Sequence, residues 1–241
     1  MNTNRKTAIS VGVLFIIATV LNVLGRSISQ PILDAPDYLI KLSANENQVI
    51  IGGLLVLLSA FASAGIAVGL YPVLRKRNQA LALGSVGFRI IENVLGIVSA
   101  ICLLSLVPLS QEYVKAGAPD ASYFQTLGTL LLGARDSISN IHLIPFCIGA
   151  LMYYYVFYQS RLIPRWLSGW GLLAVIMNLA SALLVLFDLI GDFSTVQVVL
   201  SLPIAFQEMV LAAWLIVKGF NPSAIASLSA KTATNELLSP S

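Results

Sequence analysis

A few polar and ionisable residues stand inside long apolar stretches, and they are the side chains that could carry chemistry. Arg89 and Glu92 are three positions apart in an apolar run at about 80–109, so a helix would place them on one face. Glu208 stands in a second run, at about 196–217, and Asn178 in a third, at about 166–190. We take Arg89, Glu92, Glu208 and Asn178 as a candidate buried binding cluster, and we assign no catalytic residue.

The depth of these residues predicts that they can meet. Arg89 lies ten residues after Gln79, and Glu208 lies ten residues before Lys218. At 1.5 Å per residue, both would lie roughly 15 Å from the same membrane edge. An unpaired arginine at a helix centre costs about 2.5–3.5 kcal/mol, so Arg89 needs a partner. One arginine with two glutamates leaves a nominal charge of −1, which suggests that one glutamate takes up a proton. The alternative is a purely structural clamp.

The composition identifies the surroundings of this cluster. Of the 241 residues, 57% are hydrophobic and only 10% are charged, whereas soluble domains average about 25% charged residues. Each apolar run approaches or exceeds the roughly 20 residues that cross the hydrocarbon. We therefore predict an all-α polytopic transmembrane bundle of about six membrane-spanning helices, with a transmembrane domain at 1–220 and a disordered cytoplasmic tail at 221–241. The runs lie at about 8–25, 49–74, 80–109, 138–158, 166–190 and 196–217.

The segments between the runs are more polar. We expect a polar connection over Arg26–Gln48 and a polar loop that opens the segment Ser110–Ser137. The helical pattern that follows this loop fits either an interfacial helix or one that continues into the next span. Gly65 and Gly69 share a helix face on which a neighbouring helix can approach closely.

Positive charge predicts the orientation. With the N-terminus inside, nine Lys and Arg residues fall on the inner side, so both termini are expected in the cytoplasm. The outer side holds four, which are Arg26, Lys41, Lys115 and Arg135. An aromatic belt is expected around the inner loop near Arg161. Its members would be Tyr153, Tyr154, Tyr155, Tyr158, Trp166 and Trp170.

Several classes of site lack support in the sequence. Cys102 and Cys147 lie in apolar runs and form no CxxC, and His142 is the only histidine, so we predict no metal and no cofactor. GxSxG, HExxH, Walker A and GxGxxG motifs are absent. The basic residues form no nucleic-acid-binding stripe. The expected partners are the lipid bilayer and a small-molecule or lipid ligand, while the oligomeric state stays open.

Three stretches together resemble a known family. They are LYPVLRKRNQALALGSVGFRIIENV at 70–94, SRLIPRWLSGWGLLAVI at 160–176 and LPIAFQEMVLAAWLIVKGFN at 202–221. They are similar to the bacterial membrane family named domain of unknown function 4386, and Arg89, Glu92 and Glu208 fall within them. The resemblance implies a six-helix protein of the bacterial inner membrane. It implies no activity, substrate or cofactor.

Three functions remain open at this stage. The first is a membrane protein that handles a small molecule or ion at the Arg89, Glu92 and Glu208 cluster. The second is an intramembrane enzyme that acts on lipid-like substrates, and whether the chain is an enzyme at all is undecided. The third is a non-catalytic protein that binds or regulates a partner, in which case the cluster only holds helices together.

Overall fold

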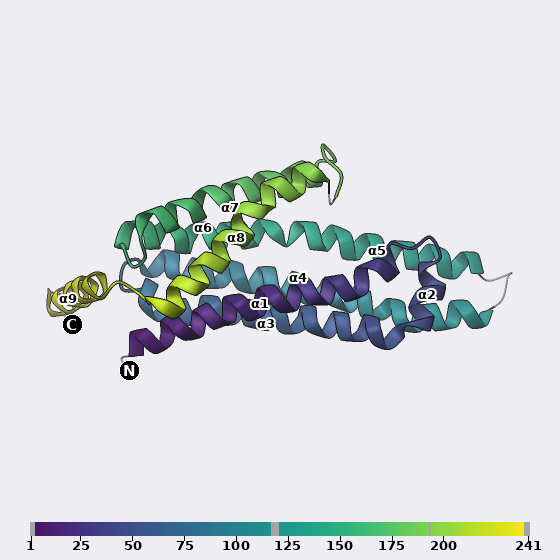
Figure 1. Ribbon diagram of the computed structural model, residues 1–241, viewed down its shortest axis with the longest axis horizontal. Coiled ribbons are helices and arrows are strands. Elements are labelled where there is room, and N and C mark those ends of the chain that lie inside the picture. The colour runs from purple at the N-terminus through teal and green to yellow at the C-terminus, as the bar shows by residue number, and fades with distance from the viewer. Residues whose placement is uncertain (1–2, 117–120, 193, 239–241) are drawn as a thin grey trace. The chain divides into compact units, whose positions relative to one another are not determined.

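The computed structural model describes residues 3–116, 121–192 and 194–238, and within these ranges the chain is helical with no strand (Figure 1). The predicted all-α class is therefore confirmed. The helices are α1 (Thr3–Leu33), α2 (Tyr38–Ala44), α3 (Glu46–Leu74), α4 (Gln79–Ala116), α5 (Ala121–Ile141), α6 (Leu143–Ser160), α7 (Arg165–Leu186), α8 (Thr195–Val217) and α9 (Pro222–Leu238).

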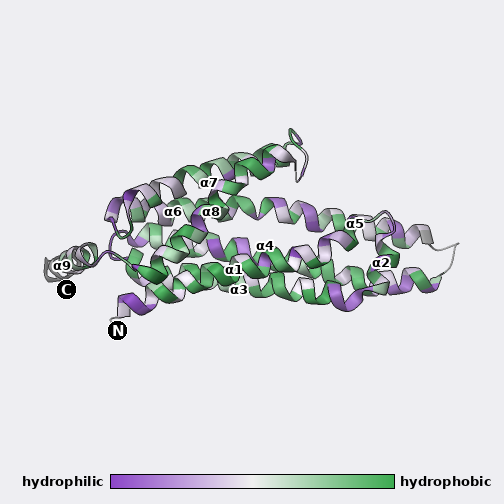
Figure 2. Ribbon diagram, in the orientation of Figure 1, coloured by the Kyte–Doolittle hydropathy of each residue, from purple (hydrophilic) through white to green (hydrophobic). Residues whose placement is uncertain are grey.

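Six helical stretches of the described chain are long and apolar enough to cross a membrane, which matches the predicted number. Figure 2 shows the apolar residues along the lengths of these helices and polar residues at their ends. Because helices satisfy their own backbone hydrogen bonds, they are suited to this solvent. The stretches are Thr3–Leu33, Glu46–Leu74, Gln79–Ala116, Ser122–Ser160, Arg165–Leu186 and Thr195–Val217.

Two stretches predicted as polar connections are helical instead, because α1 and α2 occupy most of the segment at 26–48 and α4 continues to Ala116, where the sequence predicts a loop from residue 110. Helix α1 continues to Leu33, and α2 fills much of the remaining polar segment before α3 begins. The polar residues fit the helix because the hydroxyls of Ser27 and Ser29 donate to carbonyls four residues earlier, at 2.7 and 2.9 Å. The segment after residue 120 forms α5, which leads into α6 with an interruption only at His142. This settles the alternative in favour of a helix that continues into the span.

The chain forms two compact units. Unit 1 contains the residues up to Ile16, Ser63–Glu92 and the chain from Leu143 onward, and unit 2 contains Ile17–Ala62 and Asn93–His142. In unit 1, α7 packs against both α6 and α8. The core of unit 2 is built from aliphatic side chains of α1 to α4. They are Ile32, Leu33, Leu42, Val49, Leu103, Leu106 and Val107.

Aromatic side chains of α6 form the centre of unit 1. Tyr153 and Tyr154 are fully buried, so their predicted place in an exposed aromatic belt is wrong. The close fit of α7 explains why they are inside, since a Cβ at Gly171 would lie 2.5 Å from the Tyr154 ring. A missing side chain lets two membrane helices approach and gain van der Waals contact. Tyr155 and Trp166 are exposed, as the predicted belt requires.

Small residues also join α3 to the first part of α1 in unit 1. A Cβ at Gly69 would lie 2.9 Å from Val11, and one at Gly65 would lie 3.2 Å from Leu14. The predicted close approach at these two glycines is confirmed.

In unit 1, a side chain near the start of α1 binds the end of α8. Arg5 of α1 donates to the carbonyls of Leu215 (3.2 Å), Ile216 (2.6 Å) and Val217 (3.1 Å), which are the last of α8. These carbonyls have no partner within their own helix, so a cation from elsewhere is a favourable cap. Gly219 follows with φ +74°, a left-handed conformation that glycine adopts without strain.

Helix α9 covers Pro222–Leu238, where the sequence predicts a disordered tail at 221–241. Its first turn is capped by Asn221, whose side-chain oxygen accepts from the Ser223 amide at 3.1 Å. Residues 239–241 of that prediction lie outside the described residues. The division into a domain at 1–220 and a tail stays a prediction.

Candidate functional site: the Arg89 centre

Arg89 and Glu92 of α4 form a buried ion pair in unit 1. Arg89 Nη1 lies 3.0 Å from Glu92 Oε2, and only 4% and 10% of the two side chains are exposed. Ser63 of α3 joins them, because its hydroxyl accepts from Arg89 Nη2 at 2.7 Å and donates to Glu92 Oε1 at 3.4 Å. We name the set Ser63, Arg89 and Glu92 the Arg89 centre. The predicted pairing across one helix face is present.

Helix α6 covers the guanidinium of the Arg89 centre. The ring of Phe146 lies 4.8 Å from the guanidinium carbon, a cation–π contact that is stronger where water is excluded. Gly149 permits this approach, since a Cβ there would lie 3.3 Å from both Arg89 Cγ and the Ser85 carbonyl. Backbone of α6 therefore lies against α4, where the arginine stem is packed.

Glu208 of α8 lies close enough for its charge to interact with those of Arg89 and Glu92. Its carboxyl oxygen Oε1 is covered, and within the described chain it accepts no hydrogen bond. The hydroxyl of Tyr153 is likewise covered and lies next to the Glu208 carboxyl, but the two groups do not form a hydrogen bond of good geometry. A carboxyl and a hydroxyl thus lie side by side near the Arg89 centre with incomplete hydrogen bonding, and such groups are costly in hydrocarbon.

Asn178 of α7 reaches the centre only indirectly. Its side-chain amide donates to the sulfur of Cys147 at 3.5 Å, and Cys147 in turn lies near Arg89, Glu92 and Glu208. The sequence thus named residues from three helices that the structure brings to one region of unit 1. Arg89 and Glu92 are paired, Glu208 is adjacent, and Asn178 lies one contact further away.

Sequence reasoning missed several participants. Ser63 bridges the ion pair, but hydroxyl residues are frequent in membrane helices and nothing in the pattern selects this one. Gln207 of α8, the residue before Glu208, is a second such participant. It accepts from the Tyr154 hydroxyl and donates to the Leu167 carbonyl at 3.1 Å, which joins α6, α7 and α8 beside Glu208. Both the oxygen and the nitrogen of its side-chain amide form hydrogen bonds, so Gln207 holds these helices in position.

Comparison with known proteins supports the resemblance seen in the sequence. The family model described as Domain of unknown function (DUF4386) matches residues 10–219. The chain belongs to this family. The matched region includes all the residues of the Arg89 centre together with Glu208 and Asn178, while α9 lies beyond it. No curated protein and no solved structure matches the chain. Membership in DUF4386 is therefore consistent with the apolar helices of a membrane protein, and it assigns no reaction to the chain.

Unit 2 of this DUF4386 protein holds a second polar network that the sequence did not predict. Arg135 of α5, expected in an outer segment, is buried. Its guanidinium contacts Asp136 Oδ1 at 2.9 Å and donates to Gln30 Oε1 at 3.0 Å. Ser99 of α4 donates to the Arg135 carbonyl at 3.3 Å and lies 2.9 Å from Ser139. We name this set the Arg135 network.

His142 lies beside the Arg135 network, at the interruption between α5 and α6. Its Nδ1 contacts the Ser139 carbonyl. Within residues 3–116, 121–192 and 194–238, no three His, Cys, Asp or Glu side chains gather closely enough to hold a metal ion. The histidine is part of the helix junction.

Proposed function

We propose that this DUF4386 protein handles a small molecule or ion within the membrane, and that Glu208 is the group that meets it. The observation that carries the proposal is the covered Oε1 of Glu208, which accepts no hydrogen bond in the described chain. Arg89 already has Glu92 as its ion-pair partner, so neutrality of the Arg89 centre does not require a second carboxylate. Ionisable groups at membrane depth are expensive and commonly mark ligand or proton pathways.

The surroundings of Glu208 favour a polar or cationic ligand. The Tyr153 hydroxyl offers a donor or acceptor, and the carboxyl offers acceptors or a site for a proton. Contacts with Ser63 and Phe146 hold Arg89 in place. Its guanidinium therefore provides a fixed positive charge near the Glu208 carboxyl, whose charge can change. A bound proton, a small cation or the polar end of a small molecule fits this combination.

The test compares two matched substitutions in the full chain, Glu208→Gln and Asp188→Asn. Each removes one carboxylate charge and keeps the side-chain shape, but Asp188 follows the end of α7 and is absent from the Arg89 centre. The protein is purified, small molecules that remain bound are identified by mass spectrometry, and proton or ion flux is measured in proteoliposomes. We expect Glu208→Gln to reduce retention or flux by about tenfold, because a hydrogen bond to a charged group contributes about 1.5–3 kcal/mol.

The melting temperature separates this function from a structural role. A ligand-handling Glu208 predicts that Glu208→Gln melts within a few degrees of Asp188→Asn. If Glu208→Gln lowers the melting temperature as much as Glu92→Gln does, the carboxylate belongs to a structural clamp. If wild-type protein shows neither a retained molecule nor any flux, the proposal fails as well, and a role in binding or regulating a partner protein replaces it.

We further propose that the protein resides in a bacterial inner membrane with both termini in the cytoplasm. The supporting observation is the excess of Lys and Arg in the four segments predicted to be inside. Contacts join these segments, since Arg77 donates to Gln159 at 3.3 Å, Arg5 caps α8, and the Asn221 amide donates to the Leu162 carbonyl at 2.8 Å. Labelling of single cysteines introduced near residue 76 or residue 190 with a membrane-impermeant reagent tests this. Labelling of the first position in intact cells would reverse the assignment.

A further inference from the structure

The spanning helices fall into two groups by length. Helices α6, α7 and α8 have 18, 22 and 23 residues, which is about 27–35 Å and matches a hydrocarbon layer of about 30 Å. Helix α4 has 38 residues and is about 57 Å long, while α1 and α3 are about 45 Å long. Tilt does not absorb this excess, because even a tilt of 40° lets only about 39 Å of helix fit within the layer.

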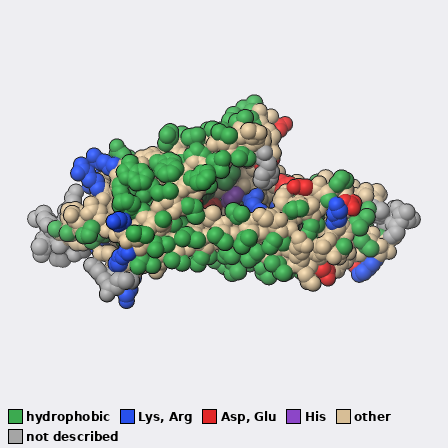
Figure 3. Space-filling model, in the orientation of Figure 1, with side chains coloured by type: hydrophobic (Ala, Val, Ile, Leu, Met, Phe, Trp, Pro, Cys, Tyr) green, Lys and Arg blue, Asp and Glu red, His purple; other side chains and the backbone are tan. Residues whose placement is uncertain are grey.

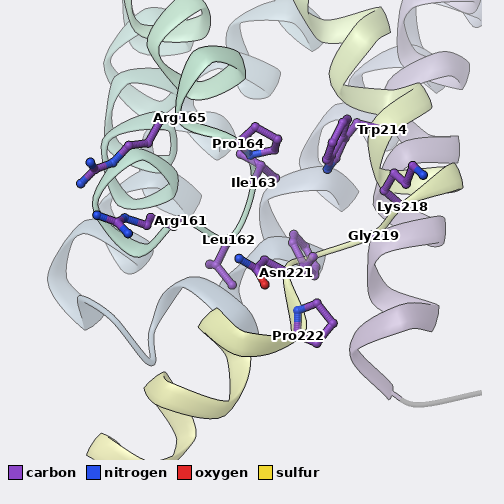
Figure 4. Close-up of a pocket in the computed structure, with 11 residues that line it drawn as sticks. Arg161, Leu162, Ile163, Pro164, Arg165, Trp214, Lys218, Gly219, Asn221 and Pro222 are labelled. Atoms are coloured by element: carbon purple, nitrogen blue, oxygen red, sulfur yellow. The ribbon is translucent and has the colours of Figure 1, made fainter.

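The short helices of unit 1 show where one edge of the membrane lies. Figure 4 shows the turns that follow α6 and α8, which line a pocket. The charged ends of Arg161 and Arg165 point out of this pocket at one rim, and Lys218 points away at the opposite rim. Cations that extend away from helix ends reach headgroups and water, and the exposed Trp166 is of a type enriched at this level.

Contacts within unit 1 place the ends of other helices at the same edge. Arg77, two residues before α4 begins, donates to Gln159 near the end of α6 at 3.3 Å. Arg5 of α1 binds the last carbonyls of α8. Because about 20 helical residues cross the hydrocarbon, the opposite edge is expected at about residue 25 on α1, residue 99 on α4 and residue 140 where α5 meets α6.

The exposed side chains of unit 2 change type at this depth. In this unit, the exposed residues of α1, α3 and α4 are apolar up to Leu24, Ile51 and Ile101, and we name the part up to these residues the apolar band. Beyond them, the exposed residues of the same helices are Ser27, Pro31, Asn47, Gln48, Pro108, Glu112, Val114 and Lys115. Figure 3 shows Asp, Glu, Lys and Arg side chains at the end of unit 2 that contains α2, whereas hydrophobic side chains cover much of the remaining visible face.

Almost all of helix α5 lies beyond the expected edge. Before residue 140, its exposed face has only two large apolar side chains, Tyr123 and Leu130. The other exposed residues there are small or polar, namely Ser122, Gln125, Thr126, Thr129, Gly133, Ala134 and Ser137. Water can bond to the polar groups of such a face, whereas acyl chains offer them no partner.

The part of unit 2 beyond the apolar band has a core of its own. All seven aliphatic core residues of unit 2 lie in this part, and Leu131 of α5 packs against them. Its polar side chains bond to one another, since Gln111 donates to Glu46 and Gln125 donates to the Tyr113 hydroxyl at 3.1 Å. An apolar interior with a polar exterior is the pattern that burial from water stabilises, and lipid supplies no such driving force between helices.

From these features we infer that acyl chains contact only the apolar band of unit 2, and that residues 25–50, 102–116 and 121–139 form a helical extension in water. The Arg135 network marks the boundary, because Ser99, which donates to the Arg135 carbonyl, lies about 20 residues along α4. The extension offers a polar surface to water-soluble partners on the side opposite the Arg5 end of unit 1. This inference does not depend on the ligand of Glu208 or on which side of the membrane faces the cytoplasm.

The first test measures which solvent surrounds exposed positions of unit 2. One spin label at a time is attached to a cysteine at Glu112 or Thr129 in the extension, or at Leu58 or Val94 in the apolar band, in full-length protein without its native cysteines. In proteoliposomes, collision rates with a water-soluble nickel chelate and with oxygen are measured. The extension labels should collide with the chelate several-fold more often than the band labels, and oxygen should show the reverse order. A label at Thr129 that behaves like the one at Val94 would overturn the inference.

The second test compares Leu130→Asp with Leu58→Asp. Both residues are exposed leucines of unit 2, at 64% and 50%, so the two variants differ mainly in the solvent that the new carboxylate meets. Aspartate is costly within hydrocarbon, so Leu58→Asp should reduce the yield of folded, membrane-inserted protein several-fold. Leu130→Asp should give nearly the wild-type yield and melt within a few degrees of wild type. An equal loss in both variants would mean that α5 faces lipid, and a normal yield of Leu58→Asp would mean that the apolar band is wrongly placed.

Discussion

The two buried arginines of the described chain are paired in different ways. Arg89 in unit 1 faces a carboxylate on the same helix that is itself almost buried, with 10% of the Glu92 side chain exposed. Arg135 in unit 2 is equally hidden, but 46% of the side chain of its partner Asp136 is exposed. The first ion pair is closed off from its surroundings, and the second opens at one side. Burial of an arginine alone therefore does not indicate how much stability is lost when its carboxylate partner is removed. That loss depends on the exposure of the carboxylate as well.

The largest expected effect tests this contrast directly. Glu92→Gln keeps the shape of the side chain but leaves the Arg89 guanidinium without its ion-pair partner. We expect the free energy of unfolding to fall by about 3–5 kcal/mol, as when one member of a buried pair is removed. Asp136→Asn should cost about 1 kcal/mol or less, because its carboxylate is half exposed. Reversible unfolding in mixed micelles measures both, and similar losses would contradict the distinction between the two arginines.

The second-largest expected effect is the loss of stability when a methyl group is added at a closely packed glycine. We expect this loss to be similar in the two units. Gly171→Ala in unit 1 would bring a Cβ within 2.5 Å of the Tyr154 ring, and Gly25→Ala in unit 2 would bring one within 2.6 Å of the Gly52 carbonyl. Each should lower stability by about 1–3 kcal/mol through overpacking.

Matched controls for these glycines exist on both units. At Gly87 and Gly96, a Cβ would have nothing within 4 Å. Alanine at either position should stabilise the helix by about 0.5–1 kcal/mol relative to glycine. If Gly87→Ala is as harmful as Gly171→Ala, the helices are sensitive to any added methyl group and the specific contact is not the cause.

The smallest effect separates the hydroxyl groups of the two networks. Ser63→Ala removes a group that accepts from Arg89 and donates to Glu92, and we expect a loss of about 1–3 kcal/mol from the buried charges left behind. Ser99→Ala removes only neutral hydrogen bonds in the Arg135 network, so about 0.5–1.5 kcal/mol is expected. A larger loss for Ser99 than for Ser63 would reverse the ranking of the two arginines. Thermal unfolding of the two variants in the same lipid mixture measures this difference.

The sequence predicted the long-range organisation because hydrocarbon imposes strong rules. Six apolar runs correspond to six helical stretches of the described chain that are long enough to span a membrane, since helix length follows from bilayer thickness. The pairing of Arg89 with Glu92 followed from their spacing of three, which is a property of a single helix.

Contacts between helices could not be read in the same way. Ser63 joins the Arg89 centre through the register of α3 against α4, and no local pattern encodes that register. Tyr153 and Tyr154 were assigned to a belt because composition identifies aromatic residues but not the face that a neighbour covers. Arg135 was placed in an outer segment because α5 is too polar to stand out as a span, although the helix carries its arginine into the core of unit 2.

The contact between Arg5 and the end of α8 has a consequence for how the protein is made. The ribosome synthesises α1 first, but the carbonyls that Arg5 binds belong to residues 215–217. The first helix therefore enters the membrane about 200 residues before its final neighbour emerges. During translation the N-terminal guanidinium must be satisfied by water or lipid phosphates, and the exchange for α8 carbonyls is one of the last steps of assembly. A chain that stops before Val217 would insert its early helices and still leave unit 1 without the element that joins its beginning to its end.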